Sequence, residues 1–104
     1  MTSHTDIERR LITIIAKSLQ IPEQTVKLDS RLMLDLEAES IDILDIRFAV
    51  EQAFGIKFDN EEIRTLLLKA AAEHNLSEKD IPQFFTVERF YEYIVLKINQ
   101  KADA

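Results

Sequence analysis

The sequence has 104 residues but no cysteine, and it contains a single glycine, Gly55, and two prolines. The absence of cysteine excludes disulfides, thiolate metal sites and a cysteine nucleophile. A single glycine also excludes the glycine-rich loops that bind phosphate in nucleotide-binding proteins. No apolar run approaches the roughly 18 residues of a membrane span, and the amino terminus lacks the organisation of a signal peptide. We therefore expect one domain that is cytoplasmic and not inserted in a membrane.

Negative charge is concentrated in one part of the chain. The net charge is −6, and the segment 29–62 has ten acidic residues against three basic ones, whereas the segments on either side are close to neutral. Nucleic acid is not an expected partner, because contact would place this surface against phosphates. The charge suits a protein partner with a basic patch, although such runs are more often simply a solvated face.

Apolar residues recur at steps of three and four, which predicts helices. Gly55 stands where a C-terminal cap is expected, and Pro82 should break regular structure before the last helix. The expected fold class is therefore all-α, a small irregular four-helix bundle with a long first connection. The expected helices are 5–20, 40–54, 60–74 and 87–99, followed by a disordered tail at 100–104.

The expected helix 40–54 is apolar around much of its circumference. Two adjacent apolar rows predict a wide buried face. The rows are Ile41, Leu44 and Phe48, and Ile43, Ile46, Val50 and Phe54.

The segment LDLEAESIDILDI, residues 34–46, places one serine, Ser40, among five carboxylates at the expected start of a helix. A calcium loop beginning at Asp35 would lack the glycine required at its sixth place and the glutamate required at its twelfth. Hydrolysis would need a base, and nothing in the flanking sequence ties His4 or His74 to Ser40. The local pattern favours Ser40 as a helix N-cap and leaves a covalent modification open.

Three stretches of the sequence resemble the acyl carrier protein family. DLEAESIDILDIRFAVEQAFGIKFDNEEI, residues 35–63, is similar to the family signature, in which an Asp-Leu pair leads to an Asp-Ser-Leu core and an apolar helix. IERRLITIIAKSLQIPEQTV, residues 7–26, is similar to the family's first helix, and TVERFYEYI, residues 86–94, is similar to its last. The similarity keeps its register through three of the expected helices.

The resemblance implies a carrier and not an enzyme, with no catalytic residue and no metal. Its cofactor would be 4′-phosphopantetheine attached to Ser40, which a phosphopantetheinyl transferase would install and on which acyl groups would be held as thioesters. Ketosynthases, acyltransferases and other acyl-processing enzymes with basic docking patches would be the partners of a monomeric carrier. The implied recognition residues are Glu39, Asp42, Asp45 and Glu51, and the implied acyl-pocket residues are Val50, Phe54, Phe58 and Ile63.

The sequence departs from the family pattern within the serine segment. Glu37 stands where the family usually has glycine, and Glu39 and Ile41 stand where it has aspartate and leucine. Arg47 adds a base to the acidic helix, which would change the set of enzymes that dock.

The largest departure is an insertion at residues 64–86, where the chain is ~18 residues longer than the common pattern, a large addition for a small domain. The run SIDILDIRFAVEQAFGIKF, residues 40–58, is similar to specialised bacterial carriers that serve very-long-chain acyl transfer to lipid A, and those carriers likewise have an enlarged region before the final helix. We expect the insertion to lengthen the third helix and to enlarge or cover the acyl pocket. Carriage of polyketide or aminoacyl units, and an unmodified acidic helical interaction module, are the alternatives to a role in fatty acid or lipid biosynthesis.

Overall fold

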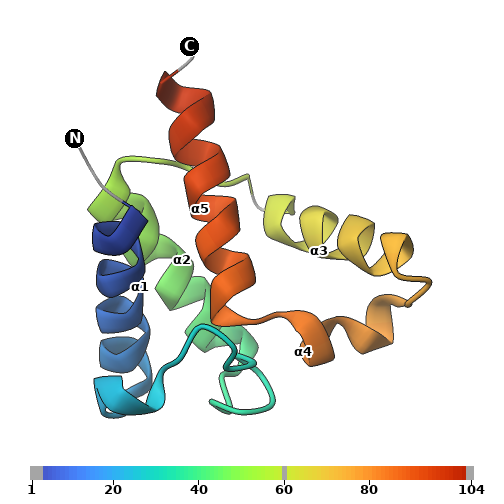
Figure 1. The fold of residues 1–104 in the computed structure, drawn as a ribbon, viewed down its shortest axis with the longest axis horizontal. Coiled ribbons are helices and arrows are strands. Elements are labelled where there is room, and N and C mark those ends of the chain that lie inside the picture. Colours follow the sequence, from blue (N-terminus) through green and yellow to red (C-terminus); the bar gives the residue numbers. More distant parts are fainter. Residues whose placement is uncertain (1–3, 60, 103–104) are drawn as a thin grey trace.

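The computed structural model describes residues 4–59 and 61–102, and over these residues it is helical without a β-strand (Figure 1). This confirms the all-α class. None of the described helices is long and apolar enough to cross a membrane. The α-helices are α1 (His4–Leu19), α2 (Ser40–Phe54), α3 (Glu62–Glu73), α4 (Ile81–Phe84) and α5 (Val87–Ala102), and the short 3₁₀ helices are η1 (Glu23–Thr25) and η2 (Glu78–Asp80).

α2 has the bounds expected from its apolar spacing, but the last helix is longer than expected. α5 continues to Ala102, so the disordered tail predicted from residue 100 is wrong for residues 100–102. Lys101 explains the extension, because its Nζ donates a hydrogen bond of 2.5 Å to the carbonyl oxygen of Gly55. A basic residue in the last turn also interacts favourably with the helix dipole. Residues 103–104 and Asn60, where the third helix was expected to begin, lie outside the described residues.

The structure contains a fifth α-helix that the sequence pattern did not predict. Pro82 was expected to interrupt regular structure, but it lies in the first turn of α4, where the missing N–H is not needed. η2 leads directly into this helix, and the Asp80 carboxylate accepts the Ser77 N–H at 2.9 Å. The insertion therefore folds back as η2 and α4 after α3 ends.

The core lies between α1, α2 and α5. Phe90 of α5 is at its centre, stacked on Phe85 at 5.9 Å and edge-on to Phe58 at 6.4 Å between ring centroids. α3 lies on the opposite side of α5 from α1 (Figure 1). The Lys97 Nζ and Glu62 Oε2 atoms, 2.8 Å apart, join α5 to the start of α3. The largest fully buried side chains are Phe58, Phe85, Phe90, Ile7, Leu11, Ile15, Leu32, Ile46, Ile94, Val50 and Val87.

The long connection between α1 and α2 is fixed by backbone hydrogen bonds to the residues that precede α5. The Leu32 N–H donates to the Phe85 carbonyl at 3.0 Å, and the Val87 N–H donates to the Ser30 carbonyl at 3.0 Å. Leu32 itself is fully buried. These bonds satisfy backbone groups that would otherwise be left unpaired and hold the approach to α2 against the core.

Two residues that flank α2 have left-handed backbone conformations. Gly55, the C-cap, has φ 64°, and Glu37 has φ 58°. Only glycine adopts this conformation without a steric penalty from Cβ. The family's usual glycine at the position of Glu37 thus has a physical reason, and Glu37 keeps that backbone shape under strain.

We predict opposite effects of substitution at these two positions. Glu37→Gly should raise the free energy of unfolding by about 1 kcal/mol, and Gly55→Ala should lower it by about 1–2 kcal/mol, as measured by urea denaturation. Glu37→Ala is the control, because it removes the carboxylate but keeps a Cβ. Equal gains from Glu37→Ala and Glu37→Gly would show that charge, and not backbone strain, is responsible.

Candidate functional site at the start of α2

Ser40 is the first residue of α2, and its side chain is exposed. The N-cap is Glu39, so the expectation that Ser40 caps the helix is wrong. The Asp42 carboxylate accepts the Glu39 N–H at 2.8 Å, and the Ile43 N–H donates to the Glu39 carbonyl at 3.0 Å. Within the described residues no group hydrogen-bonds to the Ser40 hydroxyl. The hydroxyl is therefore presented at a helix amino end without a structural task.

The chain before Ser40 is braced by a charged pair. Arg31 Nε and Nη2 donate to the two carboxylate oxygens of Asp35 at 3.0 and 2.9 Å, and the Arg31 backbone N–H donates to the same carboxylate at 2.8 Å. These side-chain and backbone hydrogen bonds lower the pKa of Asp35 to about 2. The pair closes a tight turn directly ahead of Glu37 and Ser40.

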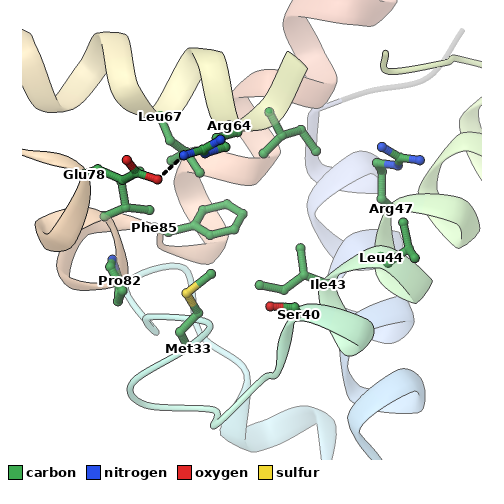
Figure 2. Close-up of a pocket in the computed structure, with 12 residues that line it drawn as sticks. Met33, Ser40, Ile43, Leu44, Arg47, Arg64, Leu67, Glu78, Pro82 and Phe85 are labelled. Carbon is green, nitrogen blue, oxygen red and sulfur yellow. Dashed lines mark hydrogen bonds and ion pairs between the residues drawn. The ribbon is translucent and has the colours of Figure 1, made fainter. Parts of the chain in front are cut away.

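Ser40 lies at the edge of a cavity of about 480 Å³ between α2, α3 and the insertion (Figure 2). Helix α2 contributes residues spaced by three, four and seven from Ser40, which lie along one side of a helix. Met33 and Phe85, from the two segments joined by the backbone bonds described above, close another side (Figure 2). The lining is mostly apolar and comprises Met33, Ser40, Ile43, Leu44, Arg47, Ile63, Arg64, Leu67, Glu78, Ile81, Pro82 and Phe85.

Of the four residues implied to line an acyl pocket, Ile63 lines this cavity. Val50 and Phe58 are buried in the core instead. Phe54 is half-buried and packs under the Arg10 guanidinium, 4.5 Å from its ring centroid. The spacing of three, four and seven residues from Ser40 is the sequence signal that could have identified Ile43, Leu44 and Arg47. The acyl-binding role implied for Val50, Phe54, Phe58 and Ile63 stays a prediction.

The four implied recognition acids differ in their surroundings. Glu39 and Asp45 are exposed, whereas Asp42 is engaged at the helix start. The Glu51 carboxylate accepts the Phe58 N–H at 2.8 Å and so holds the chain that leaves α2. Glu51 therefore has a structural task that the sequence pattern did not reveal.

One of the two apolar rows of α2 is not buried. Ile41 is 64% exposed, Phe48 50% and Leu44 43%, although the sequence predicts burial for all three. Side chains three, four and seven residues apart share one side of a helix, so these residues form a continuous apolar strip that begins beside Ser40. Such a strip, rimmed by acids, is typical of a protein interaction surface.

Comparison with known proteins identifies the family. Residues 9–67 match the family described as "Phosphopantetheine attachment site". The chain is 35% identical over 66 residues to an acyl carrier protein of Petrotoga mobilis and 38% identical over 61 residues to one of Buchnera aphidicola subsp. Baizongia pistaciae. These matches span 64% and 59% of this chain and 78% of each relative. It is also 40% identical over 53 residues to the acyl carrier protein AcpXL of Rhizobium meliloti, covering 51% of this chain and 56% of that protein.

The chain belongs to the acyl carrier protein family, whose members hold a covalently attached 4′-phosphopantetheine. An exposed hydroxyl at the edge of a mostly apolar cavity suits this cofactor. The family match ends at Leu67, so most of the insertion lies outside it.

The Arg31–Asp35 pair predicts a pH-dependent contribution to stability. Because folding lowers the pKa of Asp35 to about 2 from roughly 3.9 in an unfolded chain, the stabilisation is present above about pH 4 and is lost as the pH falls toward 2. In urea unfolding at a series of pH values, the native protein should be more stable than Asp35→Asn at neutral pH, and the difference should vanish near pH 2. Asp29→Asn, in the same connection, is the matched control for the loss of one carboxylate charge. A difference that persists at low pH would contradict the assignment.

Proposed function

We propose that Ser40 is the attachment site of 4′-phosphopantetheine and that the protein carries acyl intermediates for fatty acid or lipid biosynthesis. The observation that carries this proposal is the exposed Ser40 hydroxyl at the amino end of α2, next to a mostly apolar cavity. The bound group would supply a terminal thiol for thioesters, which a cysteine-free chain lacks.

The position of Ser40 suits a phosphodiester. The first N–H groups of a helix have no intrahelical acceptor, and the helix dipole favours negative charge at this end. The capping contact between Asp42 and Glu39 leaves the Ser40 oxygen available to attack the phosphorus of coenzyme A that bears the pantetheine arm. The attack would break the diphosphate bond and release the adenine nucleotide as the leaving group. The base that takes the hydroxyl proton and any metal ion would belong to the transferase, so the chain itself is a carrier and not an enzyme.

The surface around Ser40 suits docking by acyl-processing enzymes. Glu39, Asp42 and Asp45 would meet basic patches on a transferase, a ketosynthase or an acyltransferase, and the exposed apolar strip beside them would be covered in the complex. Glu51 would contribute less, because its carboxylate is held by the Phe58 amide. We expect a cytoplasmic monomer that forms these complexes transiently.

The insertion supports a specialised long-chain pathway, of which lipid A synthesis is the case we favour. Residues 64–86 supply half of the cavity lining, from Arg64 and Leu67 through Glu78 to Phe85. A wall made by additional chain allows a larger apolar space than a bundle without it.

Loading of the cofactor tests the attachment site. Native protein incubated with coenzyme A and a phosphopantetheinyl transferase should gain the mass of one phosphopantetheinyl group, and Ser40→Ala should gain none. Ser77→Ala, which alters another exposed serine at a helix start, should load like the native protein. No mass gain on the native chain would remove the carrier function, and a gain on Ser40→Ala would move the site elsewhere.

A series of saturated acyl chains tests the long-chain proposal. The melting temperature of loaded protein should rise with chain length, because each buried methylene stabilises the folded state by about 0.8 kcal/mol. Leu44→Trp, which adds bulk inside the cavity, should shorten the range over which it rises. Leu96→Trp, at a similarly exposed leucine of α5, should not. If long chains stabilise the fold no more than short ones, the long-chain proposal fails.

A further inference from the structure

Two arginines line the cavity, and their surroundings differ. Arg64 of α3 forms an ion pair with Glu78 of η2, and its guanidinium is also 3.7 Å from a Glu61 carboxylate oxygen. Arg47 of α2 has no ion pair or hydrogen bond from its side chain anywhere in residues 4–59 and 61–102. Its guanidinium carbon lies 5.2 Å from the centroid of the Phe48 ring.

The Nε atom of Arg47 is enclosed by the protein, and no residue that the structure describes offers it a hydrogen-bond acceptor. An enclosed donor without a partner costs free energy, and such groups are rare in folded proteins. The acid that would ordinarily pair with Arg47, four residues along the helix, is Glu51, but its carboxylate is held by the Phe58 N–H. Residues 4–59 and 61–102 therefore supply no counter-ion for this cation at the cavity.

Arg47 lies at the far end of the cavity stripe from Ser40. The two residues are seven positions apart on α2, or about 10 Å along the helix axis. Ile43 and Leu44 lie between them, and all four line the cavity (Figure 2). A chain that runs from the Ser40 end along this stripe would pass over apolar side chains and then reach a guanidinium.

We propose that Arg47 binds a carboxylate at the distal end of a carried acyl chain, so that among chains of equal length the protein prefers one with a second acidic end to a plain hydrocarbon. This inference rests on the proposed carrier function. A carboxylate pairs strongly with a guanidinium, through charge-assisted hydrogen bonds in a planar, bidentate geometry. Arg64 does not fill this role, because Glu78 already neutralises it.

The test compares two acyl groups of equal length, octanoyl and suberoyl, the second of which ends in a carboxylate. Each is transferred with its pantetheine arm to native protein, to Arg47→Met and to Arg64→Met, and loading is verified by intact mass before thermal unfolding. In the native protein the suberoyl form should melt about 4–8 °C above the octanoyl form, the shift expected for one such contact in a domain of this size. Arg47→Met should abolish this difference, whereas Arg64→Met should retain it.

A second measurement needs no variant. The Arg47 Nε–Hε resonance in the NMR spectrum of native protein should shift when suberoyl replaces octanoyl. Equal melting of the two native forms with no shift of this resonance would overturn the inference and leave the carrier function intact. The inference is also overturned if Arg47→Met keeps the higher melting temperature of the suberoyl form. It is overturned as well if Arg47→Met changes the melting temperatures of the unacylated, octanoyl and suberoyl forms equally, because Arg47 would then bind the arm or stabilise the fold. Failure of the native chain to load would remove the carrier function and this inference together.

Discussion

The backbone hydrogen bonds between residues 28–32 and 85–88 are the constraint on which the rest of the structure depends. The Glu88 N–H adds a third bond, of 2.9 Å to the Leu28 carbonyl, to those made by Leu32 and Val87. Without them the connection after α1 would be a long loop without anchors, and the end of the insertion would not be held against the core. With them, Met33 and Phe85 are brought to the same cavity, and the chain enters α2 in one defined direction.

Helix α2 contributes residues to two surfaces, the exposed apolar strip and the cavity, and Ser40 lies beside both. Ile41 and Phe48 face solvent beside the exposed acids, whereas Ile43 and Arg47 face the cavity. A group on Ser40 could therefore swing between a partner enzyme and the interior without any rearrangement of the helix. This arrangement explains why α2 is apolar around much of its circumference although only Ile46 and Val50 of it are fully buried.

The sequence predicts the elements of this fold better than their surroundings. The bounds of α2 follow from apolar spacing and from Gly55, which supplies the left-handed C-cap. Periodicity cannot separate a core row from an exposed row or a cavity row on a helix that is apolar on most sides, so the strip beginning at Ile41 was assigned to the core. Helix α4 was not predicted because proline interrupts a helix at most positions, and Pro82 is compatible with one only because it lies in the first turn. The contact that occupies Glu51 joins residues that no local pattern relates.

The insertion contributes charged as well as apolar side chains to the cavity. Glu78 comes from the insertion and neutralises Arg64, so that of the two arginines lining the cavity Arg47 is the one without an ion pair among the described residues. A small domain is stable by only about 5–15 kcal/mol, so a desolvated donor without an acceptor and a strained Glu37 are appreciable losses. Natural sequences depart from local consistency mainly at functional sites. Glu37 lies three residues before Ser40 and Arg47 seven residues after it, so these two departures flank the proposed attachment site, where a carrier adapted to an unusual cargo would differ from its relatives.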